Sequence, residues 1–504
     1  MRLKDRLYRY KRSLTGFWKE YKRSKLGLFS LGILIFYGIL AIFAPYIAPY
    51  DPSPLNRVGP NFAAPGWLAA LDPNAFPTQQ LVDNYGFLND LTGWSIVASD
   101  KEAIHAAISD ENWEKATPKS LLVRFVDQDT KKSGSELILV THEIEWKYQT
   151  VPADVFIYFD LKGNWTRDYD FSNVKVSVAL APEGYEKNKF LMKTIEKKLP
   201  IPPARIKDYG LEIFQVATTP DHWNRFKADL TYIDIYAIFD KPGKVNLILA
   251  VEINREAKGV GEIELYFDDI ELYAFSHYFG ILGTSESGAD VFSQLVWGSR
   301  VSWIIGVIST AISVAIGVIV GIVAGYCGGV VDEVLMRVVD FLLIIPGLPL
   351  MMILATILGR TIWAIVWVIA LTGWAGTARL IRSQVLSERT KAYVEAARAA
   401  GASDIYIMFR HVLPNVLPLV FVQITLGIAG AILSEAALSF LGLGPAEEAT
   451  WGKMLQWAFE HGALVRGAWW YVIFPGLAIA TLCMGFIFTG YVLDTILNPR
   501  LRRR

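Results

Sequence analysis

Apolar and polar positions divide the chain into two kinds of sequence. Residues 26–48 form an uncharged apolar run, and further apolar runs lie at about 301–325, 334–358, 362–380, 413–434 and 469–492. Each run is about as long as a helix must be to cross a bilayer. The pattern therefore predicts six transmembrane helices. The first run is too long for a signal peptide, so we expect it to remain in the mature protein.

The residues between the first two runs have a different period. Apolar and polar residues alternate, with many Val, Ile, Tyr and Phe, at 137–146, 155–159, 174–180, 230–239, 245–253 and 262–275. A period of two, broken by Gly, Pro and Asp, predicts an antiparallel β-sandwich. Residues 68–276 are accordingly predicted to be an inserted β-rich domain, in which residues 101–119 are expected to be helical. Its aromatic residues, such as Trp146, are expected to fill the core, with stacking on sugar rings as the alternative.

The distribution of charged residues predicts which side of the membrane each loop and terminus lies on. Residues 1–25 carry ten Lys or Arg against two acidic residues, the loop 379–412 is basic, and the chain ends in Arg500, Arg502, Arg503 and Arg504. Cytoplasmic loops carry an excess of Lys and Arg. Both termini and this loop are therefore predicted to be cytoplasmic, and residues 51–277 extracytoplasmic. Because the basic runs adjoin apolar ones, nucleic-acid binding is not predicted.

Composition argues against a wholly soluble protein. Hydrophobic residues make up 53% of the 504 residues and charged residues 19%. The two cysteines, Cys327 and Cys483, lie in or beside apolar runs, so the β-rich domain must be held by packing alone. No Walker A sequence is present, and the six histidines lack metal-ligand spacing. We predict no catalytic residue, metal site or cofactor in this chain, although the pair Asp268 and Asp269 leaves a Ca²⁺ site as an alternative to turn residues.

Several residues inside the apolar runs have two possible roles. Pro346 and Pro349 interrupt the third predicted helix, as a packed kink or as part of a pathway. Arg337 and Asp340, three residues apart, are expected to pair on one helix face. The role of Glu435, at the outer end of the fifth predicted helix, stays open. Small residues predict close helix contacts at Gly306, Gly317, Gly321, Gly325, Gly427 and Gly430.

The polar loop before the fifth predicted helix carries the most specific motif. The triplet Glu395-Ala396-Ala397 is followed, after three further residues, by Gly401. After eleven more residues comes the pair Leu413-Pro414. Alanines favour a short helix, and Gly401 would end it. A short helix between two spans suggests a docking element for a soluble partner. The simpler alternative is a solvated hairpin without a partner.

This spacing resembles the coupling loop of permease subunits of ABC importers. Residues 26–56 and 278–504 resemble the dipeptide/oligopeptide/nickel class of these inner-membrane permeases, with supporting segments at 43–52, 325–340, 371–386 and 434–444. The resemblance implies an α-helical polytopic membrane protein with a type I ABC importer permease fold. It implies that loop 388–412 couples to ATPases through Glu395, Ala396, Ala397, Gly401, Ala402, Ser403, Asp404, Leu413 and Pro414.

The resemblance also implies partners in the plasma (inner) membrane. These are a second homologous permease, two cytoplasmic ABC ATPases that bind ATP and Mg²⁺, an extracytoplasmic substrate-binding protein, and membrane lipid. Peptides are the implied substrate, with oligosaccharides as the alternative. A membrane-anchored ectodomain receptor or binding protein, and a channel without an ATPase, are alternatives of another class.

Three features depart from this class. His411 stands where the general importer signature has isoleucine, although members of the peptide class often have histidine there. Ala289 and Gln294 stand where the class usually carries arginines, while Arg300 is retained. The β-rich domain replaces a short loop, which suits a domain whose ends lie close together. Its aromatic-rich strands resemble carbohydrate-binding jelly rolls.

Overall fold

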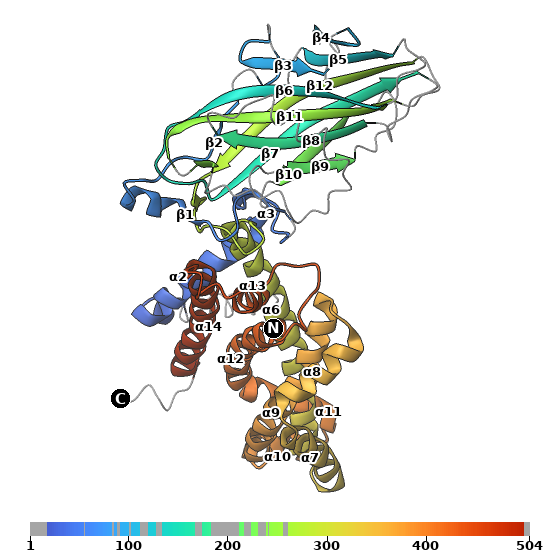
Figure 1. Cartoon of the computed structure of the whole chain (residues 1–504). Coiled ribbons are helices and arrows are strands. Elements are labelled where there is room, and N and C mark those ends of the chain that lie inside the picture. Colours follow the sequence, from blue (N-terminus) through green and yellow to red (C-terminus); the bar gives the residue numbers. More distant parts are fainter. Residues whose placement is uncertain are drawn as a thin grey trace. The chain divides into compact units, whose positions relative to one another are not determined.

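The structure is a computed structural model of the whole chain (Figure 1). It describes residues 18–54, 56–82, 85–87, 91–99, 102–110, 119–127, 134–166, 174–182, 211–215, 223–229, 238–239, 241–255 and 261–497. The basic residues before Trp18, the terminal arginines and most of the predicted strand 230–239 lie outside these ranges. The chain divides into a helical unit, Met1–Pro65 with Gly280–Arg504, and a β unit, Gly66–Phe279.

The helical unit contains long apolar helices. Five of the described helices are long and apolar enough to cross a membrane, and a bent pair, α7 and α8, would make a sixth span. This confirms the predicted polytopic fold. Its elements are α2 (Lys25–Ile42), α3 (Ala44–Ile47), α6 (Val291–Cys327), α7 (Gly329–Ile344), α8 (Gly347–Leu358), α9 (Ile362–Glu388), α10 (Ala392–Ala399), α11 (Asp404–Ile407), the π-helical turn η4 (Met408–Val412), α12 (Leu413–Phe440), α13 (Trp451–Glu460) and α14 (Trp470–Leu497).

Helix α6 begins earlier than its apolar run predicts. Asp290 caps it, and its carboxylate accepts hydrogen bonds from the main-chain N–H (2.8 Å) and the hydroxyl (2.6 Å) of Ser293. A capping carboxylate satisfies N–H groups that have no partner inside the helix. The polar first turns of α6 are therefore helical although their hydropathy is not that of a span.

The third predicted span, 334–358, is two helices rather than one. The axes of α7 and α8 differ by 92°. Ile345, before Pro346, has extended backbone (φ −70°, ψ 130°) because a proline disfavours the helical conformation of the residue before it. Pro349 lies in the first turn of α8, where its missing N–H removes no helical hydrogen bond. Only Pro346 therefore breaks the span, although both prolines were expected to.

Helices α6 and α9 pack with their backbones close together. A Cβ added at Gly317 would lie 2.8 Å from the carbonyl oxygen of Trp374, and one at Gly321 would lie 2.6 Å from that of Ala378. Both distances are shorter than van der Waals contact. The small residues of α6 thus have the packing role that the sequence predicted.

The β unit contains two antiparallel sheets. The first has the order β10-β7-β12-β5-β4 with β2 beside β12, and the second has the order β3-β6-β11-β8-β9 (Figure 1). The strands are β2 (Gln79–Gln80), β3 (Trp94–Ala98), β4 (Ile104–Ser109), β5 (Ser120–Asp127), β6 (Gly134–Trp146), β7 (Asp154–Trp165), β8 (Val174–Pro182), β9 (Leu211–Gln215), β10 (Asn224–Asp229), β11 (Gly243–Arg255) and β12 (Gly261–Phe275). The 3₁₀ turn η1 (Gly66–Leu71) and the short strand β13 (Tyr278–Phe279) are the first and last elements of the unit, and the short strand β1 (Ala64–Pro65) directly precedes it in the chain.

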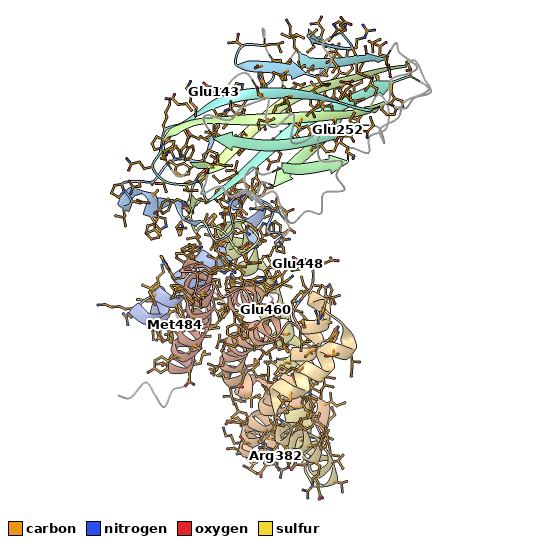
Figure 2. All side chains as sticks on the ribbon, in the orientation of Figure 1. Glu143, Glu252, Arg382, Glu448, Glu460 and Met484 are labelled. Atoms are coloured by element: carbon orange, nitrogen blue, oxygen red, sulfur yellow. The ribbon has the colours of Figure 1, made fainter. Side chains whose placement is uncertain are left out.

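Alternate residues of both sheets form one core. Phe159 of β7 and Phe267 of β12 are buried in the same cluster as Leu249 of β11. Glu143 of β6 and Glu252 of β11 (both labelled in Figure 2) occupy the alternate positions, so the strand register places them on the opposite face of their sheet. This arrangement confirms the predicted β-rich domain.

Two finer predictions for this domain have opposite outcomes. Trp146 fills the core as expected, because it is 1% exposed and its ring contacts those of Phe76, Tyr148 and Phe239. The helix predicted within 101–119 is wrong for Ile104–Ser109, which pairs along its whole length with β5. Pairing with a neighbouring strand outweighs the helix propensity of its alanines.

Candidate functional site

The motif loop forms the short helix α10. Of its eight residues only Val394 is buried, where it packs with Val385, Ile407 and Val412. Ala397 is half-buried, and the surfaces of Glu395 and Ala396 are exposed. The helix thus rests on the helical unit through Val394, with Ala397 packed beside it. It presents small side chains and one carboxylate outward, where another protein can approach closely.

Gly401 ends α10 as the sequence predicted. Its φ of +81° lies in the left-handed region, which side chains with a Cβ rarely adopt. Its N–H donates to the carbonyl of Arg398 (3.0 Å), and the N–H of Ala402 donates to that of Ala397 (3.1 Å). Ser403 then caps α11 by accepting from the N–H of Tyr406 (3.4 Å). These hydrogen bonds define the turn between α10 and α11.

Tyr326, near the end of α6, holds this loop. Its hydroxyl donates to Asp404 Oδ1 (2.7 Å) and accepts from Arg398 Nη2 (3.4 Å), and the Arg398 guanidinium lies 5.6 Å from the ring centre. Arg389 Nη1 donates to the carbonyl oxygens of Gly325 (3.1 Å) and Tyr326 (3.4 Å). Sequence reasoning missed Tyr326, Arg389 and Arg398. The end of α6 is thereby joined to α10, α11 and the loop after α9.

The Leu-Pro pair of the motif begins α12. Leu413 packs against the same apolar cluster as Val394, and Pro414 lies in the first turn, where the helix needs no N–H. The π-helical turn η4 precedes them, and its His411 has ring contacts with Tyr393 (6.3 Å) and Tyr406 (5.7 Å). The structure thus brings all parts of the motif to one end of α6, α9 and α12.

The two cysteines differ in accessibility. Cys327, the last residue of α6, is exposed, whereas Cys483 of α14 is buried. Neither thiol is part of a disulfide. Among the described residues, no three or more His, Cys, Asp or Glu side chains are grouped as metal ligands would be.

The expected ion pair between Arg337 and Asp340 is not the one that forms. Asp340 pairs with Arg379 of α9, and Arg337 lies 3.9 Å from Glu333 of its own helix. One turn away, Arg382 (Figure 2) makes two hydrogen bonds to Asp332, at 2.9 and 2.5 Å. Because α7 packs against α9, Asp332 and Asp340 of α7 meet arginines of α9, and only Glu333 pairs along its own helix.

Glu435 lies inside the helical unit rather than at its surface. It is 1% exposed, and its Oε1 accepts from Ser439 Oγ (2.6 Å) one turn later in α12. Among the contacts of the described residues, none joins Glu435 to Arg337, Asp340, Pro346 or Pro349. These five residues therefore do not form one site in the structure.

Comparisons with known proteins assign the helical unit. Residues 317–503 match the family described as binding-protein-dependent transport system inner membrane component. Residues 14–65 match the N-terminal TM domain of oligopeptide transport permease C. The dipeptide transport system permease protein DppC of Bacillus subtilis (strain 168) is 38% identical over 228 residues, which cover 45% of this chain and 70% of that protein.

Solved structures give weaker likenesses. TmCBM61, solved in complex with β-1,4-galactotriose, is 14% identical to this chain. The match covers 39% of this chain and 99% of the TmCBM61 chain, with a TM-score of 0.23. The methionine ABC transporter MetNI, in an inward-facing conformation, has a chain that is 17% identical to this one. The match covers 41% of this chain and 97% of the MetNI chain, with a TM-score of 0.35. Neither TM-score supports a conclusion.

The family assignment therefore rests on sequence and agrees with the helices described above. The matched residues lie on both sides of the β unit, which separates them in the chain. The chain belongs to the family of binding-protein-dependent transport system inner membrane components, in its dipeptide and oligopeptide permease class, and carries an inserted β unit.

Proposed function

We propose that this chain is the permease subunit of an ATP-driven importer of peptides and that α10 couples it to cytoplasmic ATPases. The observation that carries the proposal is the construction of α10. It exposes Glu395 and small residues, and Tyr326 joins Arg398 of α10 and Asp404 of α11 to the end of α6. A displacement of α10 by a partner would therefore reach a membrane-spanning helix directly.

The proposed partners follow from the family. They are a second homologous permease, two ABC ATPases that bind ATP and Mg²⁺, and an extracytoplasmic substrate-binding protein. The termini and loop 388–412 are proposed to lie in the cytoplasm, and residues 51–277 outside it, as the basic residues of the chain indicate. The chain itself supplies the pathway and performs no catalysis.

The mechanism that we propose is alternating access. ATP binding closes the two ATPases and moves α10, and the attached ends of the spanning helices follow. A peptide delivered from outside then passes between the two permeases. Copurification from native membranes tests the partners. Two ATPases and a second permease are expected, whereas a chain that purifies alone would favour an anchored ectodomain.

Replacing both Glu395 and Gly401 with alanine tests the coupling helix. The change removes a carboxylate and forces a Cβ into a left-handed conformation, which costs about 1–2 kcal/mol. The purified complex is expected to bind its substrate-binding protein but to lose transport-coupled ATP hydrolysis. Transport and ATPase rates in proteoliposomes measure this.

Gly467→Ala is the matched control for the strain at Gly401. Gly467 has a φ of +79°, and a Cβ there, as at Gly401, would meet no atom within 4 Å. It lies between α13 and α14, away from the motif. The control is expected to keep coupling. Normal coupling in the Glu395 and Gly401 variant would contradict the role of α10.

Oligosaccharide binding is a second candidate function, favoured by one observation in the β unit. Tyr158 and Tyr273, both half-buried, lie on the face of the first sheet that is opposite the core, with ring centres 6.1 Å apart. Arg225 lies over Tyr158 (5.6 Å) and donates to Glu271 Oε2 (3.0 Å). Aromatic rings beside charged groups suit sugar rings. Screening the solubilised chain against glycans and peptides, with Tyr158→Ala as control, separates the two substrates.

A further inference from the structure

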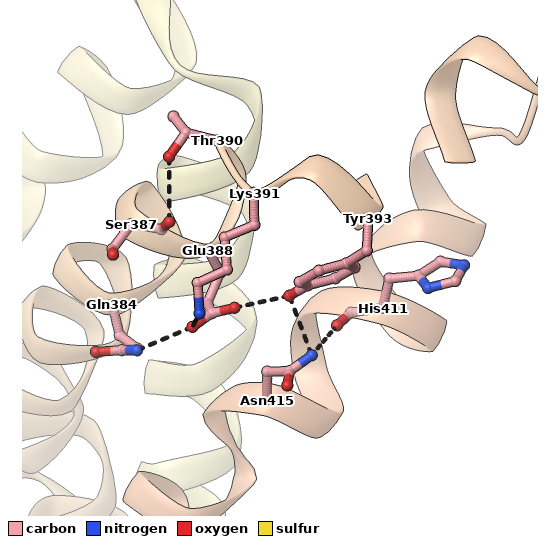
Figure 3. A network of polar contacts seen from close by, with 8 residues as sticks. All are labelled: Gln384, Ser387, Glu388, Thr390, Lys391, Tyr393, His411 and Asn415. Atoms are coloured by element: carbon pink, nitrogen blue, oxygen red, sulfur yellow. Dashed lines mark hydrogen bonds and ion pairs between the residues drawn. The ribbon is translucent and has the colours of Figure 1, made fainter. Parts of the chain in front are cut away.

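Glu388, the last residue of α9, is a buried carboxylate with three donors. Only 3% of its surface is exposed. Its Oε1 accepts from Lys391 Nζ (2.5 Å) and from Gln384 Nε2 (3.2 Å), and its Oε2 accepts from the hydroxyl of Tyr393 (2.7 Å), as Figure 3 shows. A buried charge is costly unless it is paired and hydrogen-bonded. Both oxygens of Glu388 meet this requirement.

The Tyr393 hydroxyl extends these contacts to α12. It donates to Glu388 and accepts from Asn415 Nδ2 (3.1 Å), which also donates to the main-chain carbonyl of His411 (2.6 Å) (Figure 3). Tyr393 belongs to α10, Asn415 to the first turn of α12 and His411 to η4. Burial and the bond to Glu388 raise the pKa of Tyr393, so its hydroxyl stays protonated and can donate. The end of α9 is thus connected through α10 to the start of α12.

This connection lies apart from the one made by Tyr326. Tyr326 joins the C-terminal part of the loop, Arg398 and Asp404, to α6. Glu388 joins its N-terminal part, Lys391 and Tyr393, to α9 and, through Asn415, to α12. Without the second connection, the side-chain contacts that join α10 to α9 and α12 would be the apolar ones around Val394.

We propose that Glu388 is a positioning residue for coupling, which makes α9 and α12 follow α10 through the Tyr393 hydroxyl and Asn415. The proposal rests on the proposed function of α10 and names the side chains that transmit its motion. Glu388, at the end of α9, accepts a hydrogen bond from the Tyr393 hydroxyl, and the same hydroxyl accepts one from Asn415 of α12. Neither Glu388 nor Asn415 needs to touch the ATPase or the substrate.

Tyr393→Phe is the most selective test, because it removes one oxygen atom and keeps the ring against His411. The assay uses the assembled complex in proteoliposomes and measures peptide transported per ATP hydrolysed. Loss of a hydrogen bond to a charged group corresponds to roughly a tenfold change in an equilibrium. We expect the transported amount per ATP to fall about tenfold while assembly stays unchanged and the unfolding temperature falls by no more than roughly a few degrees.

Tyr406→Phe is the matched control. The Tyr406 ring also contacts His411, and its hydroxyl has no hydrogen bond among the described residues. Glu388→Ala is expected to reduce coupling at least as much as Tyr393→Phe, and Glu388→Gln, which keeps an acceptor for Tyr393, to reduce it less. Glu388→Ala and Tyr393→Phe should be strongly non-additive in the double variant, since they remove the same connection.

The outcomes separate this inference from the proposed function. If the Glu395 and Gly401 variant is uncoupled but Tyr393→Phe and Glu388→Ala are not, α10 couples without Glu388 and the inference is wrong. If Tyr393→Phe lowers assembly or the unfolding temperature in proportion to transport, Glu388 is merely structural. If none of these variants affects coupling, the proposed function fails as well. Selective loss in Tyr393→Phe, with Tyr406→Phe unchanged, supports the inference.

Discussion

Gly321→Val is expected to prevent α6 from packing against α9 and to leave little folded protein. The first added carbon would lie 2.6 Å from the carbonyl oxygen of Ala378 and 2.8 Å from Cβ of Ile381. The backbone cannot move aside as a flexible side chain can, so the helices must separate. Overpacking typically costs about 1–3 kcal/mol, and a clash with backbone belongs at the upper end. Yield and thermal unfolding in detergent measure the effect.

Gly376→Val in α9 is the control for adding the same side chain to a spanning helix. A Cβ at Gly376 would meet no atom within 4 Å. Its yield and unfolding temperature are expected to stay close to those of the unmodified chain. Equal loss in both variants would show that valine itself, rather than the close approach of α6 and α9, destabilises the helices.

Asp160→Asn is expected to remove a pH dependence of about 4 kcal/mol from the stability of the β unit. Asp160 is 1% exposed, and burial raises the pKa of its carboxyl to about 7, despite Arg225 at 4.0 Å, which lowers it. In the unfolded chain the pKa is about 3.9. The folded form therefore holds a proton that the unfolded form has released. Its contribution is complete below about pH 4 and lost as the pH rises through 7, and three pKa units correspond to about 4 kcal/mol.

Hydrogen exchange of the β7 and β12 amides in the full-length protein measures this effect, after correction for intrinsic rates. The unmodified chain should lose protection between about pH 4 and pH 7, by roughly the amount that linkage gives. Asp160→Asn should flatten this dependence. Glu143→Gln, which removes an exposed carboxyl of β6, should not. A dependence that persists in Asp160→Asn would assign the titration to another group.

Hydropathy and period were enough to predict the spans and most strands, because both report which residues are kept away from water, in the membrane or in the core of the β unit. Long uncharged runs became α2, α6, α9, α12 and α14, and alternating segments became β6, β7, β11 and β12. Residue pattern predicted the wrong conformation for Ile104–Ser109, a short segment that contains two alanines. This segment is a strand because it pairs with β5. It also could not tell which of two prolines breaks a span, because that depends on where α8 begins.

The candidate site was predictable only where its residues are close in sequence. The motif located α10 and the turn at Gly401, since a helix and its terminating glycine are local features. Tyr326 and Asp404 are separated by 78 positions, and no local pattern links them. The partner of Asp340 was predicted wrongly for the same reason, because its arginine is on α9 and not on its own helix.

The exposed thiol of Cys327 gives the chain a natural attachment point for a spectroscopic probe. It is the next residue after Tyr326, whose side chain holds α10 and α11, and the remaining cysteine, Cys483, is shielded inside the helical unit. A thiol-reactive fluorophore or spin label would therefore mark one known position without any engineered cysteine. Motion of the motif loop could then be followed in real time in the unmutated protein.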